Sequence, residues 1–252
     1  MGKTIAITNQ KGGVGKTTTA INLTACLAEA GKNVLLIDLD PQGNSTSGLG
    51  MRVGTHTVYE ALMGRIPLTA CVMRTNIPKL SLISADIRLA GAELELVNMD
   101  EREYRLRHIL KNIEGDYDMI FIDCPPSLGL LTVNALVAAQ RVLIPIQCEY
   151  YALEGVTSLM NTINRVKHAF NPGLDIEGVL LTMLDGRTNL SIQVVDSVKK
   201  HFKSKVFSTP IPRNVRLGEA PSHGVPIHVY DSKSIGSEAY RQLARELMER
   251  NK

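Results

Sequence analysis

A glycine-rich loop containing two lysines offers the clearest chemistry in this sequence. It follows a short apolar run, leads at once into a helical pattern, and consists of Lys11, Gly12, Gly13, Val14, Gly15, Lys16, Thr17 and Thr18. Glycines let backbone N–H groups turn inward around phosphate oxygens, and the start of a helix adds positive potential. Lys16 can then reach the terminal phosphates, and the Thr17 hydroxyl can bind Mg²⁺. We therefore predict a site for a nucleoside triphosphate with Mg²⁺, on a deviant loop that has Gln10 where the GxxxxGK[ST] pattern has glycine.

Three aspartates are placed to complete the magnesium and water chemistry of such a site. Asp123 follows the apolar run 119–122, and a carboxylate at the end of a buried strand holds Mg²⁺ in phosphate-loop enzymes, directly or through water. Asp38 and Asp40 follow another apolar run and, being two residues apart, share a face of an extended strand. We predict that Asp123 and Asp38 support the metal. Asp40, farther into the loop, is predicted to orient the attacking water.

The elements that must position these residues alternate between strand and helix. Short β-rich apolar runs indicate buried strands, helical patterns separate them, and the glycine- and proline-rich stretches come directly after strands. This order predicts a doubly wound, mostly parallel α/β sheet with helices on both faces, whose ligand lies beyond the carboxyl ends of the strands. The expected strands are 4–8, 34–37, 80–83, 119–122, 142–146 and 178–183. The expected helices are 17–30, 86–97, 101–112, 152–169, 189–203 and 234–250.

The composition is that of a folded globular chain. Of 252 residues, 44% are hydrophobic and 21% charged, which argues against disorder and fibrous repeats, and the length fits a single domain over residues 1–252. Four widely spaced cysteines without a CxxC pair favour reduced thiols in a cytosol over a zinc site or a disulfide framework. No secretory leader is visible, and the apolar stretch 133–146 is too short and too interrupted to span a bilayer. We expect a cytoplasmic protein without a membrane partner.

Basic residues are concentrated in one segment, although the whole chain carries a net charge of only +3. Between positions 187 and 216, seven Lys or Arg stand against one acid, Asp196, a local balance of +6. Such a cluster offers contacts to phosphates without reading bases, so it predicts sequence-independent, salt-dependent binding of double-stranded DNA. A merely solvated helix face is the alternative. The candidate DNA-binding residues are Arg187, Lys199, Lys200, Lys203 and Arg216.

Six motifs together resemble the ParA/Soj family of chromosome-partitioning ATPases. They are KGGVGKTTT, DLDPQGN, FIDCPPSLG, QCEYYALEG, LTMLDGRTNL and IPRNVRLGEAPSHG, and the resemblance extends from residue 3 to about residue 250. The first motif is shared with all deviant phosphate-loop ATPases, whereas the later ones are more specific to this family.

The resemblance implies an ATP-dependent homodimer in which Lys11 reaches across to the partner's phosphates. A lysine supplied in this way would act like an arginine finger, and Gly12 and Gly13 permit two backbones to approach closely. The resemblance further implies an adenine site near Pro212 and Asn214, and it favours Arg187 and Arg216 as DNA contacts. It also implies slow ATP hydrolysis stimulated by a ParB-type centromere-binding protein, and a location on the nucleoid.

Three other functions share the loop. A MinD-like membrane-positioning ATPase needs a basic amphipathic anchor, and the stretch 245–250 is mixed in charge. An iron–sulfur protein needs paired cysteine ligands, and Cys124 has no second cysteine nearby in the sequence. The loop alone does not exclude an ATP-dependent small-molecule ligase, but the later motifs argue against this function.

Overall fold

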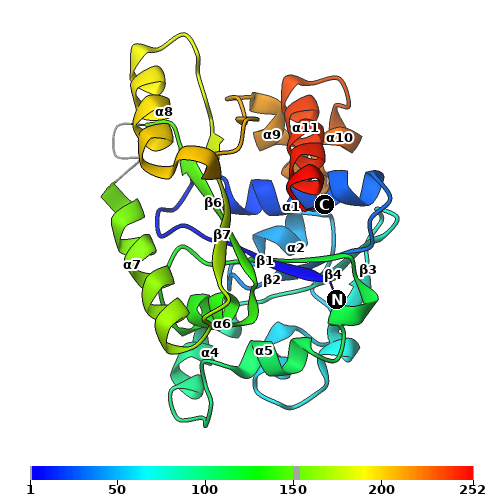
Figure 1. The fold of residues 1–252 in the computed structure, drawn as a ribbon. Coiled ribbons are helices and arrows are strands. Elements are labelled where there is room, and N and C mark those ends of the chain that lie inside the picture. Colours follow the sequence, from blue (N-terminus) through cyan, green and yellow to red (C-terminus); the bar gives the residue numbers. More distant parts are fainter. Residues whose placement is uncertain (1, 150–153, 252) are drawn as a thin grey trace.

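A seven-stranded sheet forms the centre of the computed structural model, which describes residues 2–149 and 154–251 (Figure 1). The strand order is β3-β4-β2-β5-β1-β6-β7; all neighbours are parallel except β3, which runs antiparallel to β4 at one edge. The strands are β1 (Lys3–Ile7), β2 (Val34–Asp38), β3 (Val72–Arg74), β4 (Leu80–Ile83), β5 (Met119–Asp123), β6 (Arg141–Gln147) and β7 (Asp175–Thr182).

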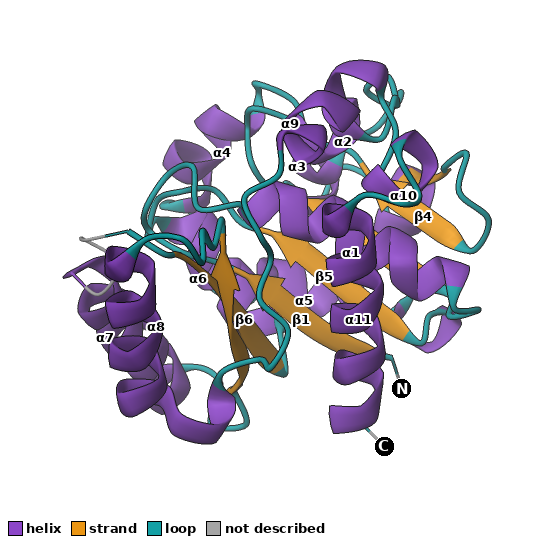
Figure 2. Cartoon of the chain, turned by 90° about the horizontal axis from the view of Figure 1, so that it is seen from above, coloured by secondary structure: helices purple, strands orange, loops and turns teal. Residues whose placement is uncertain are grey.

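Helices cover both faces of the sheet, as Figures 1 and 2 show. The longer helices are α1 (Lys16–Glu29), α4 (Leu89–Leu96), α6 (Leu130–Ala138), α7 (Glu154–Ala169), α8 (Asn189–Phe202) and α11 (Ile235–Arg250). The shorter ones are α2 (Asn44–Gly48), α3 (Val58–Leu62), α5 (Arg105–Leu110), α9 (Val215–Glu219) and α10 (Ile227–Tyr230). The 3-10 turns are η1 (Leu68–Cys71), η2 (Glu114–Asp116), η3 (Lys203–Lys205) and η4 (Ala220–His223).

The period-two pattern of the central strands divides the apolar core into two layers. In β5, Phe121 faces the layer formed with α1 and α11, whereas Ile120 and Ile122 face the layer formed with α5, α6 and α7. Because these strands are buried on both faces, they are apolar at nearly every position rather than at alternate ones. The doubly wound α/β fold predicted from the sequence is therefore confirmed.

All six predicted strands are present, with ends shifted by up to three residues. The predicted helix 101–112 is shorter, because Glu101 has a positive φ of 50° and the residues before Arg105 form turns. Residues 152 and 153 of another predicted helix lie outside the described residues; its described part is α7. The helix α6, the short helices α2, α3, α9 and α10, and the short edge strand β3 were not predicted. In α6 an all-round apolar composition hides the helical period, since the helix is largely buried.

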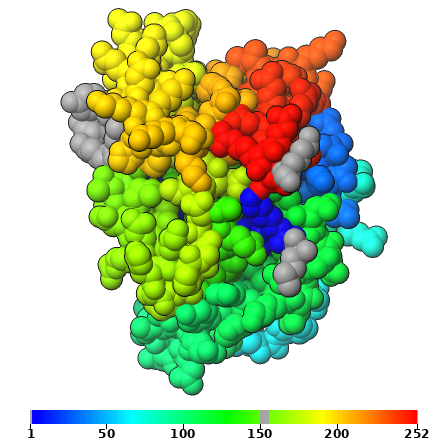
Figure 3. All heavy atoms as spheres, in the orientation of Figure 1, coloured from blue at the N-terminus to red at the C-terminus, as the bar shows by residue number. Residues whose placement is uncertain are grey.

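The first strand and the last helix meet at the surface (Figure 3). The Lys3 ammonium donates to the Asn251 side chain and lies 2.7 Å from a carboxylate oxygen of the buried Glu177. Asn251 Nδ2 in turn donates to Glu177 at 2.8 Å. These contacts join the chain ends at the amino end of the sheet, away from the loops at its carboxyl end. In the described parts of the chain, no helix is long and apolar enough to cross a membrane.

Candidate nucleotide-binding site

The glycine-rich loop connects β1 to α1 and is held from two neighbouring strands. Asn9 Oδ1 accepts from the Lys11 N–H at 3.0 Å, while its Nδ2 donates to Pro145 O at 2.7 Å. On the other side, Thr182 Oγ1 donates to Val14 O at 2.9 Å. Gly15 precedes α1 in the left-handed conformation, with φ of 87°, and has no side chain to cap the first N–H groups of the helix. These N–H groups are therefore left for an anion.

Lys16 opens α1 with its side chain largely buried. Its Nζ donates to the Lys11 carbonyl at 3.2 Å, so the loop curls around the ammonium. Burial lowers the pKa of Lys16, and the nearby Asp123 and Asp40 oppose that shift. Lys16 thus lies at the start of α1 beside the loop N–H groups, close to two acids.

Asp38 and Asp123 are register partners at the ends of adjacent strands β2 and β5. Both side chains are fully buried. Burial, and then the neighbouring Asp123, raise the pKa of Asp38 to about 7; burial raises the pKa of Asp123 to about 6, against the hydroxyls of Ser45 and Thr17. Two buried acids this close repel each other when ionised, so the pair is suited to a cation.

The oxygens around Asp123 fit a magnesium ion. Asp123 Oδ1 is buried and has no hydrogen-bond partner among the described residues, while Oδ2 accepts from Ser45 Oγ at 2.8 Å. The described residues include no group of three or more His, Cys, Asp or Glu arranged to hold a metal alone. Mg²⁺ keeps water and phosphate oxygens in its shell, so one carboxylate and the Thr17 hydroxyl are a suitable protein contribution.

Asp40 lies in the loop beyond β2, nearly buried. Its N–H donates to Asp38 Oδ1 at 3.3 Å, and its own Oδ1 accepts from the Gln42 N–H at 3.0 Å. Its carbonyl accepts from the Gly43 N–H at 2.9 Å. The side chain is thus oriented by its own loop, close enough to Lys16 to oppose the lowering of that pKa.

Ser45 and Thr46, which the sequence analysis did not select, connect α2 to both buried acids. Besides the Ser45 bond to Asp123, Thr46 donates to Asp38 Oδ2 from its Oγ1 at 2.7 Å and from its N–H at 2.8 Å. Adjacent hydroxyl residues a few positions after an acidic strand end were the available signal. The sequence alone could not show that these hydroxyls reach both acids, because that depends on β2 and β5 being adjacent strands.

The side chain of Lys11 points away from its own phosphate loop. Its Nζ lies 3.7 Å from Glu149 Oε2, just beyond β6, and 38% of the side chain is exposed. Glu149 also lies 3.8 Å from Arg213. Gly12 and Gly13 are exposed, and a Cβ added to either would meet none of the described residues within 4 Å. This edge of the loop is therefore open to a second molecule.

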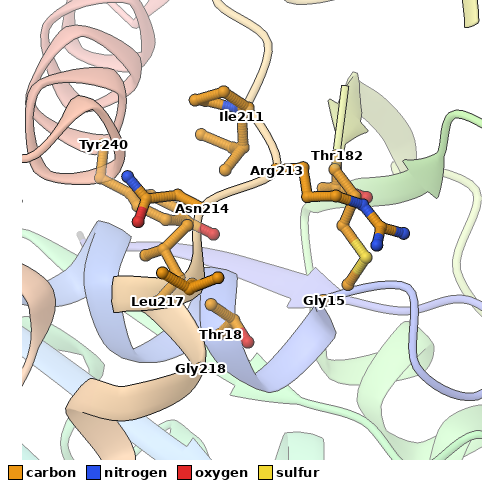
Figure 4. A pocket seen from close by; sticks show the side chains of 12 residues that line it. Gly15, Thr18, Thr182, Ile211, Arg213, Asn214, Leu217, Gly218 and Tyr240 are labelled. Carbon is orange, nitrogen blue, oxygen red and sulfur yellow. The ribbon is translucent and has the colours of Figure 1, made fainter. Parts of the chain in front are cut away.

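A cavity of about 340 Å³ opens beside the phosphate loop (Figure 4). Gly15 and Thr18 from the loop and α1 line it on one side, and Pro212, Asn214 and Leu217 line it on the other. Both residues predicted near adenine therefore lie at this cavity. Asn214 also caps α9, its Oδ1 accepting from the Arg216 N–H at 2.8 Å.

In the structure, acids from outside the predicted basic segment offset part of its positive charge. Arg187 pairs with Asp185 at 2.7 Å, and Arg216 pairs with Glu219 at 2.9 Å, so acids just outside the counted window offset both charges. Lys205 and Arg213 are also paired with acids outside the window. The exposed Lys199, Lys200 and Lys203 make no ion pair within the described residues. They lie on α8 and η3, whereas Arg216 lies on α9; both regions are in the upper part of Figure 1.

A parallel sheet with a glycine-rich loop between β1 and α1, a buried lysine and a buried aspartate at the end of β5 defines a phosphate-loop nucleotide-binding protein. A family model described as an AAA domain matches residues 2–176. The chain is 58% identical to the sporulation initiation inhibitor protein Soj of Bacillus subtilis, with 98% of each chain covered. It is 56% identical to the chromosome partitioning protein ParA of Myxococcus xanthus, covering 100% of this chain and 89% of that one. The chain therefore belongs to the ParA/Soj family of chromosome-partitioning ATPases.

Solved structures share the whole fold. A cobyrinic acid a,c-diamide synthase from Mycobacterium smegmatis, with bound ATP analog and magnesium, aligns with a TM-score of 0.87 at 40% identity, covering 99% of this chain and 95% of that one. The septum site-determining protein MinD of Pyrococcus horikoshii, complexed with Mg-ADP, aligns with a TM-score of 0.83 at 25% identity, covering 98% and 96%. Members of this fold thus hold Mg²⁺ and adenine nucleotides.

Proposed function

We propose that the chain, acting as one domain over residues 1–252, is an ATP-dependent switch. It binds ATP with Mg²⁺, forms a homodimer, binds double-stranded DNA without sequence preference, and hydrolyses ATP slowly to return to the free state. A ParB-type centromere-binding protein stimulates hydrolysis, and the protein works in the cytoplasm on the nucleoid. The observation that carries this proposal is the continuity between Asn214, which lines the cavity, and Arg216, whose N–H it caps.

The phosphate groups are bound by the loop from Lys11 to Thr18 through its N–H groups and Lys16. Thr17 and Asp123 hold Mg²⁺, and Asp38 supports that shell through its position next to Asp123. Bound Mg²⁺ neutralises charge on the phosphates. Asp123 Oδ1 supports this assignment: it is buried and has no hydrogen-bond partner in the part of the chain that the structure describes, which is costly unless a cation is nearby.

Asp40 orients the attacking water. Its loop holds it beyond the strand end, near Lys16 but outside the hydrogen bonds that tie Asp38 and Asp123 to α2. A water held by this carboxylate can attack in line with the bond that breaks, which is the positioning that phosphoryl transfer requires.

Lys11 acts on the partner's phosphates in the dimer. In one chain its side chain reaches Glu149 rather than the cradle that contains Lys16. That ion pair is half exposed and therefore weak, so moving Lys11 to a triphosphate costs little. The open backbone at Gly12 and Gly13 supports close approach of a second loop.

Adenine occupies the cavity beside Pro212 and Asn214, whose lining is largely apolar. The flat base suits such a wall, and the Asn214 amide group supplies polar contacts at its edge. DNA then contacts basic residues of α8, η3 and α9 and of the turn that precedes α8. These are Arg187, Lys199, Lys200, Lys203 and Arg216.

DNA binding measured with ATP, with ADP and without nucleotide, across a salt series, tests this function. We expect tight binding only with ATP, with log K falling linearly in log salt. Equal binding in all three conditions would contradict the switch. Binding that does not depend on salt would contradict phosphate recognition.

An ATP-dependent ligase is the second candidate, and one observation favours it: the 40% identity to the structure described as a diamide synthase. The identity to the two partitioning proteins is higher, at 58% and 56%. ATP hydrolysis by the purified chain with DNA but without any carboxylic acid or amine substrate would support the switch. Turnover that strictly requires such substrates would support the ligase.

A further inference from the structure

The loop that follows Asp40 and the segment that carries Arg216 meet backbone to backbone at two glycines. A Cβ added to Gly224 would lie 2.6 Å from the Gly50 Cα, and one added to Gly50 would lie 2.6 Å from the Gly224 carbonyl oxygen. Both glycines have positive φ, 69° at Gly50 and 64° at Gly224. We call this pair the glycine contact. It leaves no clearance, so a displacement on one side must move the other side or break the packing.

On the Gly50 side, the contact is joined to the two buried acids. Ser45 and Thr46, the acid clamp, donate to Asp123 and Asp38 from the first turn of α2. Both clamp residues are buried, and α2 ends only two residues before Gly50. α2 therefore cannot shift without breaking a buried charge-assisted hydrogen bond to one of the acids.

On the Gly224 side, the glycine contact lies at the end of a continuous helical unit. α9 passes directly into η4, and Gly224 terminates η4, its N–H donating to the Pro221 carbonyl at 3.0 Å. Arg216 lies at the start of this unit, and Leu217 and Gly218 line the nucleotide cavity. α2 contacts η4 directly. A push at Gly224 is thus applied to the same short unit that orients Arg216.

We propose that Ser45 and Thr46 are positioning residues that couple nucleotide binding to DNA binding within one subunit. The acid clamp sets the position of α2 according to what the acids bind, and the glycine contact passes that position to the unit carrying Arg216. Packed contacts of this kind adopt discrete arrangements rather than deforming smoothly. This inference rests on the proposed function, because it explains how ATP raises DNA affinity beyond joining two subunits.

The test separates dimerisation from DNA binding in Gly224→Asn and Gly50→Asn. Asparagine tolerates positive φ, so these variants mainly insert a Cβ into the contact. We expect ATP-dependent dimerisation by analytical ultracentrifugation to match the parent. The ratio of DNA dissociation constants with ADP and with ATP should fall by about tenfold, within the roughly 5- to 150-fold range of coupling between sites.

Gly31→Asn is the matched control. Gly31 also has positive φ, 93°, but its added Cβ would meet only the tip of Lys79 at 3.8 Å. This control should keep the parent's ratio. If Gly224→Asn and Gly50→Asn keep the parent's ratio as well, the inference is overturned while the proposed function stands. If the parent itself binds DNA equally with ATP and ADP, both fail together.

Thr46→Val and Thr46→Ser test the other end of the same route and decide the matter if a glycine variant does not fold. Valine keeps the shape but removes the Oγ1 bond to Asp38, whereas serine keeps the hydroxyl. We expect the valine variant to dimerise with ATP, but its ratio of DNA dissociation constants with ADP and with ATP should fall most of the way to one. The serine variant should keep the parent's ratio. A parental ratio in the valine variant would refute the role of the acid clamp.

Discussion

Asp38 and Asp123 stand opposite each other in register on β2 and β5, and consecutive residues of α2, Thr46 and Ser45, donate to one oxygen of each. The two acids are buried, and burial raises the pKa of both. This arrangement places two acids beside the loop that concentrates positive charge.

Substitution of Lys16 should impair ATP binding, whereas substitution of Lys11 should impair dimerisation. Lys16→Ala should weaken ATP binding by at least roughly 10- to 100-fold, since a hydrogen bond to a charged group contributes about 1.5–3 kcal/mol. Lys11→Ala should bind ATP in its own loop but remain monomeric, because the missing charge belongs to the partner's phosphates. Equilibrium binding of a fluorescent ATP analogue and analytical ultracentrifugation measure the two properties. Parental dimerisation of Lys11→Ala would disprove the role across the interface.

Asp40→Ala should trap the ATP-bound dimer. The substitution removes the carboxylate that orients water but leaves Lys16, Asp123 and the loop N–H groups in place. We expect hydrolysis to fall by about 10²- to 10⁴-fold, the usual contribution of such a group, with ATP affinity unchanged. Single-turnover hydrolysis with sedimentation in ATP tests this. Asp40→Asn serves as the shape-matched comparison, and a variant that stays monomeric in ATP would show that Asp40 has another role.

Arg216→Glu, and to a lesser degree Arg187→Glu, should lose DNA binding while keeping the ATP dimer. Removal of one phosphate contact per subunit takes two from a dimer, so the slope of log K against log salt should fall by about 2, at roughly 0.9 per contact. Each arginine forms an ion pair within the chain, so each substitution also removes the partner of an acid. That acid is Glu219 for Arg216 and Asp185 for Arg187.

Arg107→Glu provides the control for that charge reversal. It changes net charge by the same amount at an exposed position of α5, far from α9 in Figure 1. Its affinity and salt slope should match those of the parent. If Arg216→Glu also matches the parent, the basic segment is only a solvated surface.

His228 should make stability depend on pH. Its Nδ1 is buried without a hydrogen-bond partner among the described residues, and burial lowers its pKa below 6.5 despite the opposing charge of Glu29. The folded protein therefore binds this proton less well than the unfolded chain. The stability held by neutral His228 is complete above about pH 6.5 and is lost as pH falls through the lower folded pKa.

Urea unfolding between pH 7.5 and about pH 5 measures this effect. In His228→Gln the free energy of unfolding should fall less on acidification than in the parent. His201→Gln, at an exposed position on α8, should follow the parent. Identical pH profiles for the parent and His228→Gln would refute the contribution.

The phosphate loop, the acidic strand ends and the parallel α/β order were predictable from the sequence alone. These features are local: apolar runs of strand length, a helix start after Gly15, and acids directly after strands each depend on neighbours in the chain. The resemblance to the family added Pro212 and Asn214, which periodicity could not have supplied. α6 was missed because a helix buried on most sides has no polar face to mark its period.

Which distant groups meet depends on the three-dimensional fold. The pairing of Asp38 with Asp123 follows from the order of β2 and β5 in the sheet, and the approach of Arg216 to Asp231 at 3.6 Å depends on how the chain turns back after α9. The contact between Gly50 and Gly224 joins residues far apart in sequence. Such contacts arise from packing in three dimensions, where distances of a few tenths of an ångström matter, and no pattern along the chain encodes them.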